Sequence, residues 1–492
     1  MPASRTGRSP SMVNTSVLFL VLALLCLPWA DLHVSTQDPW LELGRLGQGL
    51  LSPTLPSPGL LFQALANTLA FALQGVALGV ALGLALALAY RRGWVRRLAA
   101  GLRAIHELFW ALLFIQLVGL SAPAGVLAIA LPYAGTFAKI YGELFEEADP
   151  APRAALPPGG GGLSLALFTT VPQSLRHMAS YTAYRLECGI RSSAVLGFIG
   201  LPTLGYHLES LLRQGHYGEG ASYFYALLLI IATLRWWLRP ALVPLYLLAA
   251  LCWLPPVAEL NWTLVANFIG HDLVPAPLRS GTELLPWLAE LWRHQLWPGL
   301  ANTLVLSLLA LLATGLLALA WFPTISRHFG GPARRSASHF LLVLMRSLPE
   351  YLLAFVGMLL WGPSMLPAIL ALGLHNGAII AHLVGRHADA LKLREDAATG
   401  LNRYCFEVLP RLYRSFLAYS LYRFETIIRE TAILGMLGIP TLGFFIDSAF
   451  AEFRFDRALV LLLAAATLNI GVDALARWLR RRLHLHSQAE AL

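Results

Sequence analysis

The segment YRLECGIR at residues 184–191 returns as YRFETIIR at residues 422–429. Three shorter matches continue at the same offset of 238 residues: AVLG at 194–197 and AILG at 432–435, Gly200 and Gly438, and PTLG at 202–205 and 440–443. Farther upstream, LANTL occurs at both 65–69 and 300–304. Charged residues, glycines and a proline that recur at one offset indicate a duplicated unit. We therefore predict two repeats, residues 1–238 and 239–492.

The composition indicates that both repeats lie in a lipid bilayer. Apolar residues make up 57% of the 492 residues and charged residues 13%, and the mean hydropathy is +0.62. A span of the hydrocarbon core takes about 20 apolar residues, and apolar runs recur along the whole chain: 61–90, 126–140, 223–234, 300–321, 340–361 and 458–470. We predict an all-α polytopic membrane protein with about 12 transmembrane helices, arranged as two parallel six-helix repeats.

The basic residues predict the orientation in the membrane. Cytoplasmic segments carry an excess of Lys and Arg, and with a cytoplasmic N-terminus few of the 36 basic residues fall in outer segments: Arg45, Arg213, Arg279, Arg293, Arg454 and Arg457. The apolar run 17–27 after Arg5 and Arg8 resembles a secretory signal, but its counterpart at 242–254 indicates a retained helix. We expect a multi-pass protein of a bacterial inner membrane with both termini cytoplasmic.

By our count the inner segments carry 25 Lys and Arg and the outer segments six, which leaves five inside predicted spans: Lys139, Arg185, Arg191, Arg423 and Arg429. A charge within a span is costly and needs a partner or water. Glu187 and Arg191 are four residues apart, as are Glu425 and Arg429, so each couple is predicted to form an ion pair on one helical face.

Arg185 and Arg423 each lie two residues before the glutamate, about 200° around the helix, so they need other partners. One interpretation is that they line a pore for a dianion, because guanidinium matches oxyanion geometry. The other is that all four arginines of the two blocks hold helices together through buried pairs. Glu430 shares the stripe of Arg423 and offsets its charge, whereas Arg185 has no such neighbour in the sequence.

Four glycines of the repeated block are candidates for unusual backbone angles: Gly200, Gly205, Gly438 and Gly443. They could leave amides directed at an anion near the outer end of a pore. An ordinary helix end with a tight turn is the alternative.

These blocks resemble the permease subunits of phosphonate ABC importers, in which a span opens with Arg-Ser-Leu-Pro-Glu, as at 346–350, and a Tyr-Arg-x-Glu-x-x-x-Arg helix follows. The resemblance covers roughly residues 60–237 and 298–477. It implies a transport channel without enzymatic activity or cofactor, driven by two cytosolic ABC ATPase subunits and fed by one periplasmic substrate-binding protein. Such permeases normally act as two copies around one pore, and this chain would supply both.

The resemblance also implies a cytoplasmic coupling loop in each half. The first loop would contain Ala154, Ala155 and Gly159, with Arg153 where the family has glutamate. The second would contain Glu395, Ala397 and Gly400, and it is about three residues shorter before its Leu-Pro. Unequal contact with the two ATPases is therefore expected.

Other functions find less support in the residues. The sequence has no HExxH, Gly-x-Ser-x-Gly or phosphate-binding loop, and His375, His382 and His387 are not spaced to bind a metal on one helical face. The net charge of +9 is scattered between apolar spans and does not indicate nucleic acid. A membrane-embedded enzyme or a non-transporting scaffold remains an alternative, and phosphite, phosphate, selenate or another small solute an alternative substrate.

Overall fold

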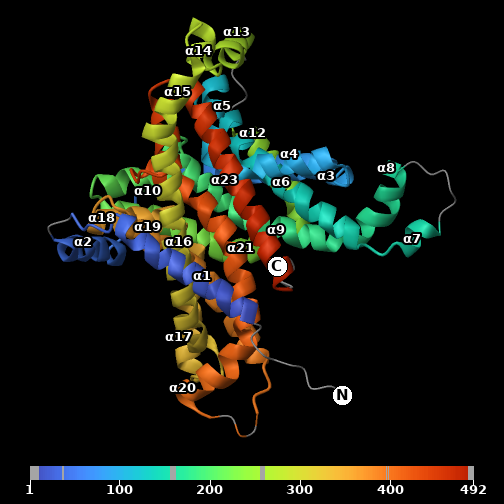
Figure 1. Ribbon diagram of the computed structural model, residues 1–492, viewed down its shortest axis with the longest axis vertical. Coiled ribbons are helices and arrows are strands. Elements are labelled where there is room, and N and C mark those ends of the chain that lie inside the picture. The colour runs from blue at the N-terminus through green and yellow to red at the C-terminus, as the bar shows by residue number, and fades with distance from the viewer. Residues whose placement is uncertain are drawn as a thin grey trace. The chain divides into compact units, whose positions relative to one another are not determined.

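The computed structural model describes residues 10–35, 38–155, 162–254, 261–394, 396 and 398–485, and these form helices joined by turns, with no strand among them (Figure 1). The helices are α1 (Pro10–Cys26), α2 (Pro39–Leu51), α3 (Pro58–Leu88), α4 (Gly93–Ala104), α5 (Glu107–Val118), α6 (Ala122–Glu147), α7 (Ala151–Ala154), α8 (Gly162–Leu165), α9 (Val171–Val195), α10 (Leu204–Arg213), α11 (Tyr217–Trp237), α12 (Val243–Trp253), α13 (Trp262–Asn267), α14 (Ala276–Ser280), α15 (Leu284–Leu291), α16 (Trp297–Ile325), α17 (Pro332–Ser347), α18 (Glu350–Trp361), α19 (Met365–Ala390), α20 (Gly400–Asn402), α21 (Leu409–Met436), α22 (Leu442–Ala451) and α23 (Phe455–Arg482).

The apolar helices confirm an all-α polytopic membrane protein. Seven helices of the described chain are long and apolar enough to cross a membrane, and the number rises to ten if each of three bent pairs is one span. The bend is 89° between α4 and α5, 94° between α17 and α18, and 51° between α9 and α10. We expected about twelve spans. Two further helices fail the test of length and composition: α12 is too short, and α21 contains too many charged residues.

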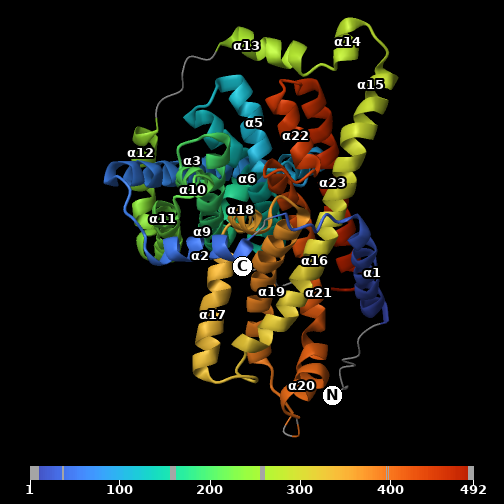
Figure 2. The same ribbon diagram turned by 90° about the vertical axis from the view of Figure 1, so that its left-hand side faces the viewer.

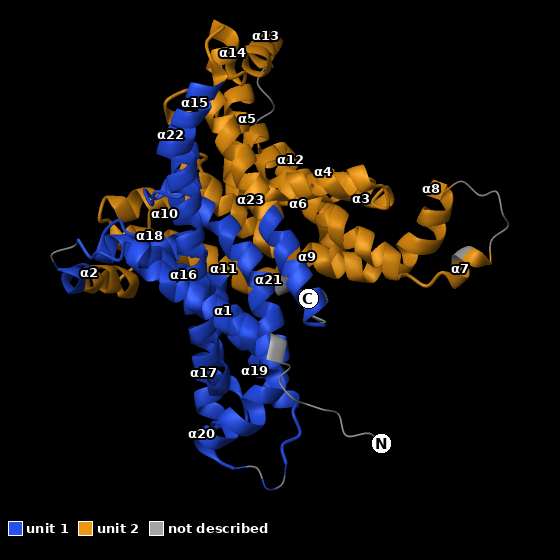
Figure 3. Cartoon of the chain, in the orientation of Figure 1, with its two compact units in different colours: residues 1–42, 285–449, 471–492 blue, residues 43–284, 450–470 orange. Residues whose placement is uncertain are grey.

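Two structural units make up the chain, and each combines separate sequence segments (Figure 3). Unit 1 contains residues 1–42, 285–449 and 471–492, and unit 2 contains residues 43–284 and 450–470. The first helix of the sequence thus belongs with the second set of long helices. In unit 1, α1 packs against α16, and the amide of Met365 donates a hydrogen bond of 2.8 Å to the carbonyl of Asp31. In unit 2, α12 packs against α3, where the Trp253 indole donates to Asn67 over 2.8 Å.

Unit 2 is centred on the contact between α3 and α6, the most extensive in that unit. Gly75, Gly79 and Gly83 recur every four residues on α3, and this stripe brings the two backbones close together. A Cβ added at each glycine would meet a Cβ of α6 at 3.0 Å or less: Ile129 at 2.7 Å, Tyr133 at 3.0 Å and Phe137 at 2.5 Å. Larger residues on α3 would therefore separate the helices.

Unit 1 repeats this arrangement with α16 and α19, but the glycines are on the other helix. An added Cβ on Gly373 of α19 would lie 2.8 Å from Cβ of Ala313, and one on Gly377 would lie 3.0 Å from Cβ of Leu317. Figure 2 shows α16, α19 and α17 of unit 1 running alongside one another. The close approach is thus common to both units, whereas the residues that permit it differ.

Three long helices begin with an X-Pro step that follows directly on a π-helical turn: Ala166–Thr170 before α9, Trp292–Leu296 before α16, and Arg403–Val408 before α21. Proline lacks the amide that would bond to the carbonyl four residues earlier, and its ring clashes with that carbonyl. A π turn widens the helix by one residue at this place and relieves the clash. The chain therefore enters each helix without a break.

The turn between α9 and α10 is held by residues of α3. The amide of Leu204 donates to the Thr68 hydroxyl over 2.9 Å, and the Asn67 side chain donates to the carbonyl of Pro202 over 2.8 Å. In unit 1 the same two bonds join Leu442 to Thr303 over 3.0 Å and Asn302 to Pro440 over 2.8 Å. The repeated LANTL and PTLG segments therefore contact each other within each unit.

The glycines of this turn have specific backbone roles. Gly200 and Gly438 have φ angles of +94° and +96°, which favour glycine. A Cβ on Gly205 would lie 1.9 Å from the carbonyl oxygen of Ala194, and one on Gly443 would lie 2.0 Å from that of Ala432. The turn thus packs its backbone directly against the preceding helix, as a tight helix end does.

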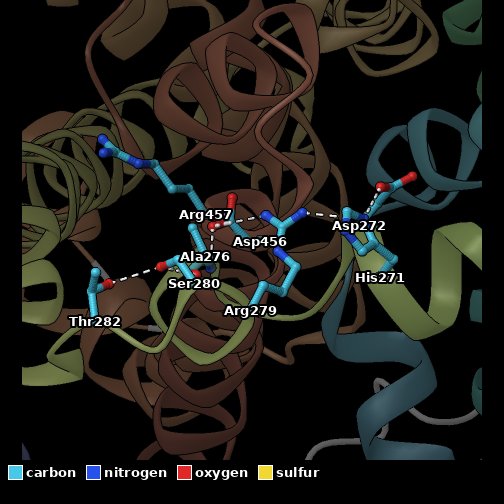
Figure 4. A network of polar contacts seen from close by, with 8 residues as sticks. All are labelled: His271, Asp272, Ala276, Arg279, Ser280, Thr282, Asp456 and Arg457. Atoms are coloured by element: carbon cyan, nitrogen blue, oxygen red, sulfur yellow. Dashed lines mark hydrogen bonds and ion pairs between the residues drawn. The ribbon is translucent and has the colours of Figure 1, made fainter.

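A polar network in unit 2 joins the segment 271–282 to the start of α23 (Figure 4). Asp456 accepts a hydrogen bond from the amide of Ala276 over 2.9 Å and lies 3.9 Å from Arg279. Arg279 in turn contacts His271 over 3.3 Å, and Asp456 also accepts from the amide of Arg457 over 2.8 Å. One carboxylate therefore anchors the short helix α14 to α23.

We expect Gly443→Ala to destabilise the protein strongly, because the new methyl group has no room beside the Ala432 carbonyl. Overpacking of this kind costs about 1–3 kcal/mol or more. Thermal unfolding in detergent should show a clear decrease in Tm. Gly471→Ala is the matched control, since no atom lies within 4 Å of its added Cβ. Equal Tm values for the two variants would contradict the packing described here.

Candidate functional site

The charged helices α9 and α21 are the candidate substrate pathway, and a largely buried carboxylate lies beside each. In unit 2 this carboxylate is Glu107, the first residue of α5 after the 89° bend. Ser192 of α9 donates to Glu107 over 2.7 Å, and the Tyr133 hydroxyl lies 3.2 Å from that serine oxygen. Because Ser192 gives its only hydroxyl proton to the carboxylate, Tyr133 must be the donor in the second bond.

His106 is a further polar neighbour of Glu107. Its Nε2 lies 3.5 Å from the Glu107 carboxylate, and its Nδ1 accepts from the amide of Leu108 over 3.2 Å, which caps α5. Both side chains are largely buried, with 7% and 16% exposed. This cluster was not predicted from the sequence, because its members come from helices that lie far apart in the chain.

Arg185 of α9 lies among aromatic rings in unit 2. Its guanidinium carbon is 5.2 Å from the ring centroid of Tyr181, 5.8 Å from that of Tyr184 and 5.9 Å from that of Tyr133. Its Nε also donates to the Tyr181 hydroxyl over 2.7 Å. Ring faces attract a cation, so these tyrosines hold Arg185 in place.

Arg423 of α21 has a different environment in unit 1. Its Nε donates to the Asn376 side-chain oxygen over 2.7 Å, and the Asn376 amide donates to Glu430 over 3.2 Å. Asn376 and Glu430 are both buried. Arg423 and Glu430, which the sequence predicts on one face of the helix, are thus linked through Asn376 of α19. This bridge was not predicted.

Unit 1 also has a histidine beside a glutamate at its bend. Glu350 opens α18, and Nε2 of His375 on α19 lies 3.6 Å from its carboxylate. The Nδ1 of His375 contacts the carbonyl of Leu348 over 2.8 Å and therefore donates to it. In the repeat, His106 corresponds to Pro349 and His375 to Pro132. Each unit therefore has a histidine near the corresponding glutamate, but the histidine comes from a different position of the repeat.

The predicted ion pairs stay predictions. The contact described for Arg191 within α9 joins its guanidinium to the Cys188 sulfur over 3.4 Å. Glu187, Arg191, Glu425 and Arg429 are all half-buried. The four turn glycines lie in the packed turns described above, and their role toward an anion also stays a prediction.

The coupling loops are described only in part. Ala154 ends the short helix α7 and Ala155 follows it, whereas Gly159, Glu395 and Ala397 lie outside the described residues. Gly400 begins α20 with a φ of +62°. In this second loop Asp396 pairs with Arg394 at 2.8 Å, and the hydrogen bond from Arg394 lowers the pKa of Asp396. Arg403 donates to the carbonyls of Ala398 and His328, which holds the loop against the helical part of unit 1.

The described residues contain no group of three or more His, Cys, Asp or Glu side chains that could hold a metal ion. The buried polar clusters instead combine arginine, tyrosine, amide and carboxylate groups. Such groups can stabilise a passing anion by hydrogen bonds and charge.

Comparison with known proteins found no matching family model. The chain is similar to the phosphate-import permease protein PhnE of Mycolicibacterium smegmatis, with 25% identity over 482 residues that cover 89% of this chain and 88% of the relative. It is also similar to the phosphite transport system permease protein PtxC of Stutzerimonas stutzeri, with 32% identity over 44% of this chain and 82% of the relative. A putative cryptic phosphonate transport system permease protein of Escherichia coli is 27% identical over 23% of this chain and 98% of its own length.

The resemblance in the charged helices is thus matched by identity across most of the length of transport permeases. These relatives are transport permeases. The chain belongs to the phosphonate-type family of ABC importer permeases.

Proposed function

We propose that one copy of this chain forms the whole transmembrane channel of an ABC importer for phosphonate or a related tetrahedral oxyanion. Two cytosolic ATPase subunits would drive it, and one periplasmic binding protein would deliver the substrate. The observation that carries this proposal is the presence of the same charged, partly buried helix in each unit, α9 and α21. A long relative that aligns over 89% of the chain, and a shorter one that aligns over 44%, support two fused copies.

The substrate class is supported by chemistry and by the relatives. The names of these relatives refer to phosphate, phosphite and phosphonate. All three are tetrahedral oxyanions that guanidinium groups bind well. Phosphite, phosphate and selenate therefore stay alternatives to phosphonate. Arg185, held by tyrosine rings, is our candidate for the residue that attracts the anion, whereas Arg423 is linked through Asn376 to a glutamate.

A bacterial inner membrane with both termini cytoplasmic agrees best with the basic residues. Arg334 and Arg335 at the start of α17, and Arg480 to Arg482 at the end of α23, would then face the cytoplasm. The segment that holds α13 and α14 would be periplasmic.

The fused-dimer proposal predicts that one chain binds two ATPase subunits. Purification of the detergent-solubilised complex, followed by native mass spectrometry, should give a ratio of one to two. One ATPase per chain, or two copies of this chain around one pore, would refute the proposal.

The proposed orientation predicts opposite accessibility for Ser280 and Gly331, both exposed residues. In a background whose four native cysteines are replaced by serine, a cysteine at position 280 should react with an impermeant maleimide in intact spheroplasts. A cysteine at position 331 should react only after permeabilisation. The reverse pattern would overturn the orientation.

Arg185→Gln should lower phosphonate uptake while the protein stays abundant in the membrane. Loss of the cation–π contacts should lower the free energy of unfolding by about 0.5–2 kcal/mol. Most folded proteins tolerate a loss of this size without unfolding. Arg423→Gln should mainly reduce abundance, because breaking a buried charge network costs about 3–5 kcal/mol. Uptake of radiolabelled phosphonate per copy of protein, with immunoblots for abundance, separates the two effects. Unchanged uptake in Arg185→Gln would exclude a role in the pathway.

A further inference from the structure

Helices α17 and α19 of unit 1 lie side by side (Figure 2), and basic side chains gather between them. Residues spaced by three, four or seven positions share one face of a helix, and each of the two helices carries such a row: Arg335, His339 and Arg346 on α17, and His382, Arg386 and Asp389 on α19. The rows face each other, because the ring centroids of His339 and His382 are 5.1 Å apart.

Asp389 is the only carboxylate in the two rows, and it lies at their end, where other groups already bind it. Asp389 lies 3.2 Å from the guanidinium of Arg335 and also accepts a hydrogen bond of 2.7 Å from the amide of Arg327. His339 faces His382 across the two helices, and Arg386 lies one helical turn after His382 on the same face of α19. Arg386 therefore adds a positive charge beside the two rings.

His382 is the buried member of this cluster. His382 is 8% exposed. Its Nδ1 is shielded from solvent and has no hydrogen-bond partner in the described chain. A buried ring nitrogen in this position costs stability unless a ligand satisfies it. His339 and Arg386 are exposed and stand at the open side.

The first repeat shows that the fold does not require this charge pattern. The residues that correspond to His339, His382, Arg386 and Asp389 are Arg96, Lys139, Glu143 and Glu146. There, Arg96 pairs with Glu146 at 2.7 Å, and Lys139 lies 4.0 Å from Glu143. Unit 2 thus neutralises its row internally, whereas unit 1 has an arginine in place of the neutralising glutamate.

We propose that His339, His382 and Arg386 form a binding site for a phosphate-type oxyanion group. A guanidinium and two imidazole groups on facing helices can each donate a hydrogen bond to a tetrahedral anion. The group would come from free phosphate or from the headgroup of an anionic phospholipid. Binding here does not depend on transport, so its failure would leave the proposed function standing.

The first experiment measures binding of inorganic phosphate to the purified, delipidated chain in detergent. Equilibrium binding of radiolabelled phosphate is compared at constant ionic strength for the wild type, Arg386→Glu and His339→Ala. Both altered residues are exposed, and glutamate already occupies the corresponding position 143, so both variants should fold. We expect both variants to bind phosphate at least about tenfold more weakly than the wild type, because each loses one hydrogen bond to a charged ligand. Arg97→Glu, an exposed arginine of α4 with the same change of charge, should bind as the wild type does.

The second experiment tests the lipid source. Native mass spectrometry with short-chain phosphatidylglycerol, and with phosphatidylcholine as the zwitterionic control, counts retained lipids. Retention of phosphatidylglycerol that Arg386→Glu abolishes would support the site with a lipid headgroup as its ligand, and phosphate binding that the variant abolishes would support a free oxyanion. If neither ligand binds, or if Arg386→Glu and Arg97→Glu bind both equally, the proposal is wrong.

Discussion

The hydrogen bond from a turn amide to a threonine hydroxyl of the neighbouring long helix positions the end of each charged helix. Thr68 accepts from Leu204 in unit 2 and Thr303 accepts from Leu442 in unit 1, at 2.9 and 3.0 Å. A backbone amide in an apolar environment must find an acceptor, and the turn after the charged helix leaves its amides without helical ones. This bond therefore fixes the turn that follows α9 and α21 against the neighbouring long helix of the same unit.

The two units meet the same physical requirements with different residues. Close approach of the two central helices relies on glycines of α3 in one unit and of α19 in the other. A histidine lies near the glutamate at the bend in both units, yet it comes from position 106 in one and from position 375 in the other. What the duplicated sequence preserves is a contact, and either partner of that contact can supply the group that makes it.

Some of this architecture can be predicted from the sequence, and the physical reason for the limit is clear. The repeat, the apolar spans and the charged block follow from local patterns, because hydropathy and helical spacing are properties of neighbouring residues. The pairing of LANTL with PTLG, the Asn376 bridge and the packing of α1 against α16 depend on how helices rotate against one another.

A single chain that carries both halves of a channel can differ between them in ways that two identical copies cannot. In a symmetric pair, a substitution such as glutamate to arginine at position 143 would appear twice, and each copy would lose its neutralising carboxylate. Here the row of Arg96, Lys139 and Glu143 keeps its ion pairs, while the row of His382 and Arg386 has an arginine in place of the glutamate. The same freedom applies to the charged helices, where Arg185 is held by tyrosine rings and Arg423 by an amide linked to Glu430. In the proposed single-chain channel, fusion would separate the structural requirement, which both halves retain, from the charge of each half, which selection can alter independently.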